Sequence, residues 1–170
     1  MKPEEFEPIL REHQAMVYSI AYHFFHNVAL AEEVAQDVFL QLYENRKTIA
    51  SRSHAASWLR RAVTHRCIDA LRHKSMQSEL QFEELPDISY DSSEPDPLLK
   101  ERLRRLVASL PVHLRMVVVL RYGEDMDVEE ISRTLDMPVR TVWSNLQRAT
   151  ALMRTKASRY LKEEANESIR

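Results

Sequence analysis

Glycine and cysteine are nearly absent from this chain of 170 residues, which contains one residue of each kind. A single glycine, Gly123, leaves little material for tight hairpin turns and none for a glycine-rich phosphate loop. An all-α fold is therefore the first expectation. Cys67 has no second cysteine with which to form an intramolecular disulfide, and this fits a reducing compartment.

Long hydrophobic runs are missing as well. No apolar stretch is long enough to span a bilayer, and the acidic N-terminal sequence MKPEEFEPIL lacks the apolar core of a secretory signal. We therefore expect a cytoplasmic protein without membrane insertion.

The seven histidines come without the partners that metal and catalytic sites require. No cysteine pair, no HExxH motif and no carboxylate–histidine set accompanies His23, His26 or Cys67. Neither a serine nor the cysteine lies in a recognisable nucleophile motif. The sequence predicts no metal, no cofactor and no enzymatic activity.

Charge is unevenly distributed, although the net charge is only −2. The segment from Ser75 to Leu99 contains no lysine or arginine and is rich in acids, whereas the segment just before it is basic. Prolines and serines also accumulate in residues 75–97, which predicts a flexible acidic linker between two helical domains. We expect domains at residues 1–74 and 98–160, and a charged tail at 161–170.

The strongest pattern in the chain is the stretch from Asp127 to Arg154, which predicts two short helices around a tight corner. Val128, Ile131 and Leu135 recur at helical spacing, and Asp127 is suited to cap the first helix. Pro138 disfavours helix in the residue before it and so breaks the pattern. This layout is typical of a helix-turn-helix whose second helix enters DNA.

The second of these helices has a buried stripe and an opposite polar face. The stripe contains Val142, Leu146, Ala149 and Met153. The polar face presents side chains that suit phosphates and base edges: Arg140, Thr141, Ser144, Gln147 and Arg148. The alternative is a helical hairpin with an ordinary solvated face.

Two helices are expected at the N-terminus, over residues 4–26 and 30–43, with Asn27 as the stop between them. The outer face of the second helix shows Leu40 among Glu33, Gln36 and Asp37. A leucine with a charged rim is typical of a docking surface. From the residues alone, an ordinary exposed leucine is the favoured interpretation.

A polar connector, residues 47–54, leads to a helix expected over residues 55–73. Its buried arc includes Cys67, which we interpret as a small core residue. Trp58 falls on the other side with Arg61, His65 and Arg72, a combination that suits unpaired nucleic acid. Packing of Trp58 against a neighbouring helix is at least an equal alternative.

Taken together, these residues resemble a group IV, or extracytoplasmic-function, bacterial RNA polymerase sigma factor of the sigma-70 family. AEEVAQDVFLQLYENRKTI resembles the family's polymerase-binding helix, and SWLRRAVTHRCIDALRHK resembles its helix for the promoter −10 element. LPVHLRMVVVLRYGEDMDVEEISRTLDMPVRTVWSNLQRATALMR resembles its −35-reading domain and is the most specific match.

The resemblance implies a function and a set of contacts. The chain would be a promoter-specificity subunit whose partners are core RNA polymerase, promoter DNA and an anti-sigma factor. Docking on the clamp coiled coil of the largest polymerase subunit falls to Glu33, Gln36, Asp37 and Leu40. Contacts with the −10 element fall to Ser51, Arg52 and Ser53 of the base-capturing loop and to Trp58, Arg61, His65 and Arg72. Contacts with the −35 element fall to Arg140, Thr141, Ser144, Asn145, Gln147 and Arg148.

The sequence departs from the family pattern at four of these positions or beside them. His65 stands where asparagine is usual, Arg140 replaces a glycine, Trp143 a common lysine and Asn145 a common arginine. From His65 we therefore expect an altered −10 preference, and from the other three residues an unusual −35 sequence preference. Two rival hypotheses are a stand-alone helix-turn-helix regulator with a sensing or dimerising N-terminal half, and an all-α adaptor without a nucleic-acid role.

Overall fold

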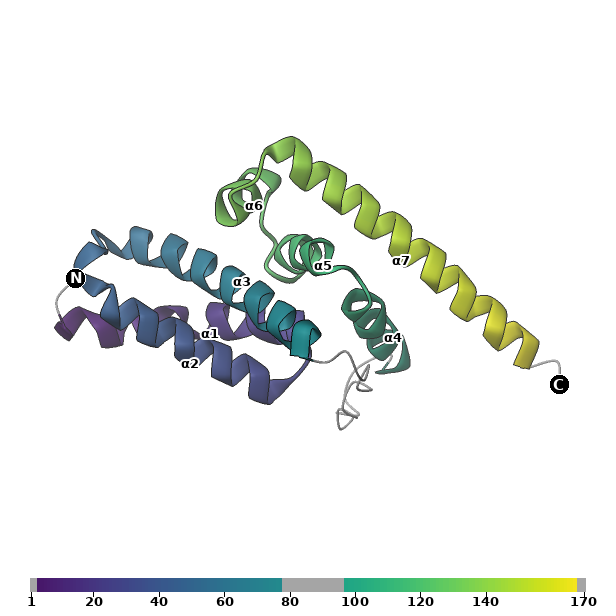
Figure 1. The fold of residues 1–170 in the computed structure, drawn as a ribbon, viewed down its shortest axis with the longest axis horizontal. Coiled ribbons are helices and arrows are strands. Elements are labelled where there is room, and N and C mark those ends of the chain that lie inside the picture. Colours follow the sequence, from purple (N-terminus) through teal and green to yellow (C-terminus); the bar gives the residue numbers. More distant parts are fainter. Residues whose placement is uncertain (1–2, 78–96, 168–170) are drawn as a thin grey trace.

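The computed structural model describes residues 3–77 and 97–167, with side chains for residues 4–73 and 98–159. Within these ranges the chain is all-α, as predicted, with seven α-helices and no strand (Figure 1). The acidic linker predicted for residues 75–97 lies almost entirely outside the described residues. Among the described helices, none combines the length and the apolar character that crossing a membrane requires.

The helices form two regions along the chain. The N-terminal region contains η1 (Pro3–Glu5), α1 (Phe6–Phe25), α2 (Val28–Glu44), η2 (Arg46–Thr48) and α3 (Arg52–Gln77). The C-terminal region contains α4 (Pro97–Ala108), α5 (Val112–Val118), η3 (Val119–Gly123), α6 (Val128–Leu135) and α7 (Val139–Glu167). The segments η1 and η2 are single 3₁₀ turns, and η3 is a π-helical turn that continues α5. Helix α7 continues into the residues predicted to form the charged tail.

The N-terminal region is a three-helix bundle held by apolar stripes at helical spacing. Val17, Ile20 and Phe24 of α1 are fully buried against α3, where Leu59 and Val63 are also fully buried. Cys67 lies in the same core, as predicted, and burial raises the pKa of its thiol. A thiol that stays protonated is a poor nucleophile.

The corner between α1 and α2 differs from the prediction, which placed the stop at Asn27. His26 is the residue that adopts the left-handed conformation, with φ of 49°, and its N–H donates to the carbonyl of Tyr22. Asn27 is extended and begins the next helix, because its side-chain oxygen accepts a hydrogen bond of 3.0 Å from the Leu30 N–H. Asparagine is among the best residues for this capping position.

The connector before α3 is shorter than the predicted polar segment at residues 47–54. Ile49 is buried at 3% exposure, and α3 begins at Arg52 rather than at Ala55. The helix starts early because the Ser51 hydroxyl accepts a hydrogen bond of 3.1 Å from the His54 N–H. A serine in this position satisfies an N–H that has no partner within the helix.

The predicted helix-turn-helix is present as α6, a corner and α7. Asp127 accepts from the Glu130 N–H at 2.7 Å while the Glu130 carboxylate accepts from the Asp127 N–H at 3.0 Å, which forms a capping box. Asp136 turns the corner in the left-handed conformation. Val142 and Ala149 of α7 are fully buried, so the predicted stripe faces the core.

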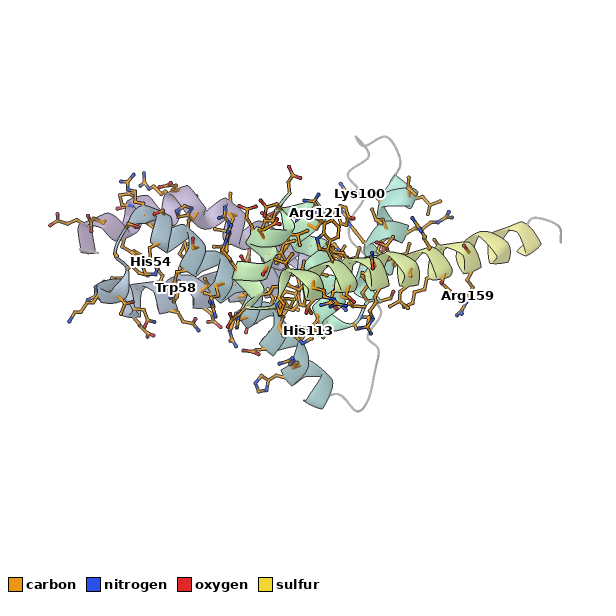
Figure 2. The ribbon with its side chains drawn as sticks, turned by 90° about the horizontal axis from the view of Figure 1, so that it is seen from above. His54, Trp58, Lys100, His113, Arg121 and Arg159 are labelled. Carbon is orange, nitrogen blue, oxygen red and sulfur yellow. The ribbon has the colours of Figure 1, made fainter. Side chains whose placement is uncertain are left out.

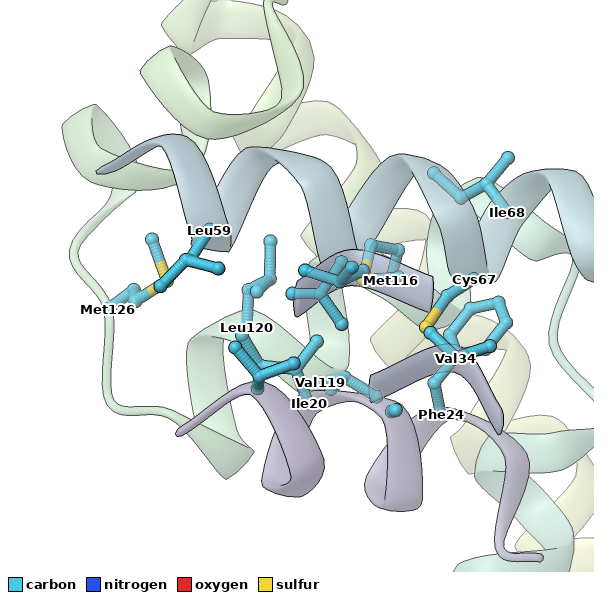
Figure 3. Close-up of a cluster of buried hydrophobic side chains, with 14 of the residues drawn as sticks. Ile20, Phe24, Val34, Leu59, Cys67, Ile68, Met116, Val119, Leu120 and Met126 are labelled. Atoms are coloured by element: carbon cyan, nitrogen blue, oxygen red, sulfur yellow. The ribbon is translucent and has the colours of Figure 1, made fainter. Parts of the chain in front are cut away.

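One cluster of buried side chains crosses the boundary between the two regions. It joins residues of α1 and α3 to Met116 of α5, Leu120 of η3 and Met126 of the following turn (Figure 3). Met116 and Leu120 have no exposed surface, and α3 contacts both α5 and α6. The two regions therefore share a core. A second, smaller cluster lies within the C-terminal region around Leu110 and Leu114.

Polar contacts surround this shared core. The Ser19 hydroxyl donates to the Glu124 carboxylate at 2.6 Å, and His23 Nδ1 lies 3.7 Å from the same oxygen. Arg115 donates to the backbone carbonyls of Ala108 and Phe24, and its guanidinium lies 5.2 Å from the centre of the Phe24 ring. These contacts join α1 to the C-terminal region.

Candidate nucleic-acid interface

The polar face of α7 is open to solvent. Arg140, Thr141, Ser144, Gln147 and Arg148 are all exposed, opposite the buried stripe that fixes α7 against α5 and α6. Their side chains combine cationic groups with hydroxyl and amide groups, which can bond to phosphates and to base edges in the major groove. The structure therefore places five of the predicted residues on one accessible helix face.

Asn145 is the member of the predicted −35 set that lies away from this face. It is half-buried, and its amide nitrogen lies 3.8 Å from the sulfur of Met137 in the corner. At this position the side chain contacts the preceding corner. The position follows from helical geometry, because Asn145 lies one turn from both Val142 and Ala149, which are fully buried.

A hollow with a volume of about 440 Å³ lies along the flank of α7 beside η3. Tyr122 and Trp143 line it and are 71% and 54% exposed, and Arg154 and Gln147 line the same side. From the sequence, Trp143 stands out only as a departure from the family pattern, and no role is predicted for Tyr122. The only sequence feature that distinguishes Tyr122 is its position directly before the single glycine, Gly123.

The predicted contact residues of α3 are partly engaged by the C-terminal region. Figure 2 labels two of the residues concerned, Trp58 of α3 and His113 of α5. Trp58 is half-buried and packs against the shared core, and His65 is exposed. Arg61 forms an ion pair of 3.2 Å with Asp136 in the corner before α7, and Arg72 Nη2 lies 2.8 Å from His113 Nε2 of α5. Two of the cations therefore contact the other half of the chain.

The three residues predicted for the base-capturing loop lie at the start of α3. Arg52 and Ser53 belong to the first turn of that helix, and all three side chains are exposed. The Ser51 and Ser53 hydroxyls lie 3.0 Å apart. A helix N-terminus with exposed hydroxyls and a guanidinium suits an anionic backbone.

The residues predicted to dock on polymerase do not all lie on one face of α2. Gln36 and Leu40 line a groove between α1 and α2 with a volume of about 930 Å³, and Leu40 is 62% exposed. Asp37 points instead toward α3, where Arg66 donates to it at 3.0 and 2.5 Å. Glu33 is exposed beside them. The Asp37 carboxylate thus joins α2 to α3.

The groove contains aromatic residues that the sequence analysis missed. Phe6, Tyr18, Phe39 and Tyr43 line it, and the rings of Phe6 and Tyr43 meet edge to face with centres 5.2 Å apart. The available signal was the pair of adjacent apolar residues, Phe39 and Leu40. Two neighbours on a helix point in different directions, so they cannot both belong to one narrow buried stripe. An apolar groove of this size is suited to bind a helix of another protein.

The histidines form no cluster of three or more potential metal ligands anywhere in the described part of the chain. His26 is buried, and neither ring nitrogen has a hydrogen-bond partner. Burial, together with the positive charges of Arg104, His23 and Arg115, lowers the pKa of His26 from 6.5 to about 4. Its ring is therefore neutral near pH 7.

Comparison with known proteins places both regions in one family. The family models for sigma-70 region 2 and sigma-70 region 4 match residues 9–76 and 100–153 respectively. The RNA polymerase sigma-E factor of Streptomyces avermitilis is 31% identical over 150 residues, which span 88% of this chain and 83% of that protein. The extracytoplasmic-function sigma factor SigW of Bacillus subtilis is 26% identical over 168 residues, spanning 89% and 88%.

A solved structure has the same fold. The sigma factor RpoE of Bartonella quintana, crystallised in complex with the anti-sigma factor NepR, superposes with a TM-score of 0.73. The match covers 89% of this chain and 96% of that chain at 15% identity. With both sigma-70 regions present in order, the chain belongs to the sigma-70 family of RNA polymerase sigma factors, in its extracytoplasmic-function group.

Proposed function

We propose that this sigma factor is a promoter-specificity subunit that binds core RNA polymerase and directs initiation at promoters with −10 and −35 elements. It selects DNA and does not itself catalyse a reaction. The single observation that supports this best is the exposed polar face of α7, held by a capped helix-turn-helix in a chain that also has a second cationic helix, α3.

In this proposal α7 reads the −35 element. Five exposed side chains on one face meet phosphates and base edges, and the buried stripe of the same helix fixes their direction. Arg140 and Arg148 provide cationic contacts, whereas the half-buried Asn145 supports the corner.

The predicted contact residues of α3 and the exposed start of that helix serve the −10 element. An aromatic side chain among cations can stack on unpaired bases while the guanidiniums meet the phosphates. Opening of the duplex is then driven by capture of unstacked bases, without hydrolysis.

Core polymerase docks on the groove between α1 and α2. Leu40 is the exposed apolar residue at the centre, and the aromatic side chains of the groove bury surface around it. The modest net charge is consistent with this proposal. Core polymerase would itself bind DNA phosphates, so this chain needs only to select the sequence. Control by an anti-sigma factor is part of the proposal, supported by the fold shared with a sigma factor crystallised with one.

The test is to add the purified chain to core polymerase and to map transcription start sites across a genomic library. Promoter-specific initiation supports the proposal. DNA footprints that do not need polymerase would favour a stand-alone helix-turn-helix regulator, and the absence of any salt-dependent DNA binding would favour an adaptor.

Two substitutions should separate the surfaces. Arg148→Ala is expected to weaken −35 binding by about 1–3 kcal/mol, with polymerase binding unchanged, while Arg133→Ala on the exposed side of α6 serves as a charge-matched control. Leu40→Ala is expected to weaken binding to polymerase while −35 binding persists, with the exposed Val28→Ala as its control. If Arg148→Ala abolished polymerase assembly, the division into surfaces would be wrong.

A further inference from the structure

Helix α7 continues well past the residues proposed to read the −35 element. It runs to Glu167 as one helix that passes α5 and α4 (Figure 1). Figure 2 shows Arg159 toward the far end of this helix, away from the helices of the N-terminal region. The match to sigma-70 region 4 ends at residue 153. The side chains of residues 154–159 therefore lie beyond both the family match and the proposed −35 contact set.

This helix carries positive charge without compensating acids. From Met137 to Lys162 the sequence contains six lysines and arginines and no aspartate or glutamate, although the whole chain has a net charge of −2. An ordinary solvated helix face carries charges of both signs, which pair one turn apart. Arg154 and Arg159 are exposed, and neither has an ion-pair or hydrogen-bond partner among the residues that the structure describes. Helix α7 therefore presents an uncompensated cationic surface.

The exposed face of α7 extends into this segment. Six exposed residues follow one another at steps of three or four, the spacing of one helix face: Arg140, Ser144, Gln147, Ala151, Arg154 and Ser158. Arg159 borders the same face. On the opposite side Met153 packs against the smaller buried cluster, and the Lys156 ammonium donates to the carbonyl of Ser109 at 3.1 Å. These contacts fix the direction in which Arg154 and Arg159 point.

The length of this face limits what its far end can bind. Arg159 lies about 28 Å from Arg140 along the helix axis, at a rise of about 1.5 Å per residue. The major groove is only about 12 Å wide, and a recognition helix contacts base edges with its N-terminal residues. The far end of the face therefore lies past the edge of the groove, where DNA presents phosphates. A guanidinium binds a phosphate without regard to sequence.

We propose that Arg154 and Arg159 bind phosphates of duplex DNA outside the −35 element, which gives α7 a sequence-independent contact in addition to its base contacts. This inference rests on the proposed function, because the −35 contact is what places the helix on DNA. An acidic surface of core polymerase is the other possible occupant. The unbroken continuation of the −35 face into these two arginines favours DNA.

Three variants test the two arginines. Arg154→Ala with Arg159→Ala removes both charges, and alanine keeps the helix because it is the strongest helix former. Arg154→Lys with Arg159→Lys keeps both charges. Lys156→Ala is the matched control, because it removes a charge from the same segment on the side that faces Ser109. All three variants leave the proposed −35 contact set intact.

The first measurement is the salt dependence of promoter binding. The full chain is assembled with core polymerase, and its affinity for a promoter fragment mapped as above is determined over a range of salt concentrations. In the double alanine variant the slope of log affinity against log salt should fall in magnitude by about 2. Binding at physiological salt should be about tenfold weaker. The double lysine variant and Lys156→Ala should keep the wild-type slope.

The loss should be the same for every −35 sequence. The ratio of affinities for the mapped element and for one with a single base pair changed should therefore be unaltered in the double alanine variant. Arg148→Ala, which removes a proposed base contact, should change this ratio.

The second measurement locates the phosphates. Methylphosphonate linkages remove the charge of one phosphate at a time, and they are placed on both strands across the −35 element and one helical turn of DNA on either side. Neutral linkages outside the element should weaken binding of the wild type. The same linkages should leave binding of the double alanine variant unchanged, because its contacts to them are already lost.

An unchanged salt slope in the double alanine variant, or the same linkage pattern in both proteins, would overturn the inference. So would weaker assembly of that variant with core polymerase, which would assign the two arginines to a polymerase contact. If the wild type gives no promoter-specific start sites with core polymerase, the proposed function fails. If start sites are present and the slope is unchanged, only this inference fails.

Discussion

The two helices proposed to read the promoter, α3 and α7, present their contact residues differently. On α7 the polar side chains between Arg140 and Arg148 are exposed, opposite a stripe that is buried against α5 and α6. On α3, Arg61 and Arg72 contact residues from the other half of the chain while remaining exposed, and the half-buried Trp58 packs on the shared core. The comparison shows that, among the described residues, the polar side chains of α7 form no hydrogen bond or ion pair with the N-terminal region, whereas two cations of the α3 set contact the other half of the chain and its tryptophan packs on the core that both regions share.

The first way to break this comparison is to weaken the shared core. Leu120→Ala removes a fully buried side chain between the regions, and we expect a loss of about 2–5 kcal/mol in the free energy of unfolding. Denaturation is followed by fluorescence, because the two tryptophans, Trp58 and Trp143, lie in different regions and either is removable by substitution with phenylalanine.

Both tryptophans should report one midpoint in the wild type and the same lower midpoint in Leu120→Ala. The control is Leu103→Ala, which truncates an exposed leucine of α4 and should change the free energy of unfolding by about 0.5 kcal/mol at most. Two well-separated midpoints in the wild type would contradict a core shared by the regions.

The second way is to acidify the solution, because the buried His26 ends α1 and is near enough to Arg104 of α4 and Arg115 of α5 for their charges to act on its pKa. The pKa of this buried ring is about 4 in the folded chain and 6.5 in the unfolded chain, so the unfolded chain binds the proton first as the pH falls. The contribution of the neutral His26 ring to the free energy of unfolding is fully present above about pH 6.5. Between pH 6.5 and pH 4 it falls by about 3 kcal/mol in all.

This decline should appear in urea titrations at several pH values. His26→Asn keeps a residue that tolerates the left-handed corner and removes the ionisable ring, so the slope between pH 6.5 and 4 should flatten. His73→Asn, at an exposed position of α3, should leave the slope as it is in the wild type. An unchanged slope in His26→Asn would assign the acid sensitivity to other groups.

The smallest expected effect comes from a substitution in α6, the helix that packs against α7, and it tests whether the two proposed DNA-contact surfaces are independent. Asp127→Ala removes the carboxylate of the capping box at α6, and we expect a loss of about 1 kcal/mol in stability together with weaker −35 binding. Glu129→Ala, an exposed acid in the same first turn, is the matched control. If −10 binding fell as much as −35 binding, the two surfaces would not be independent.

Much of this architecture could be predicted from the sequence, because helical periodicity and capping are local properties. The spacing of Val142, Leu146 and Ala149 predicts the buried side of α7, and the position of Asp127 before an apolar period predicts a helix cap. The core position of Cys67 followed from the same reasoning. These predictions needed only neighbours within a few turns.

What could not be predicted depends on long-range contacts. Nothing in the sequence indicated that Arg61 would meet Asp136, seventy-five positions away, or that Glu124 would reach Ser19. The His26 corner was missed because asparagine next to it also tolerates left-handed geometry, and the capping role of Asn27 decided between them. The assignment of individual residues to DNA and polymerase contacts stays a prediction.

The way the chain turns its corners has a practical consequence for engineering. His26, Asp125 and Asp136 all adopt left-handed backbone angles, although glycine would do so without steric cost. Among the described residues, three corners therefore carry a steric cost that glycine would remove, and glycine substitution at one of the exposed corners, Asp125 or Asp136, should raise the temperature at which the protein unfolds.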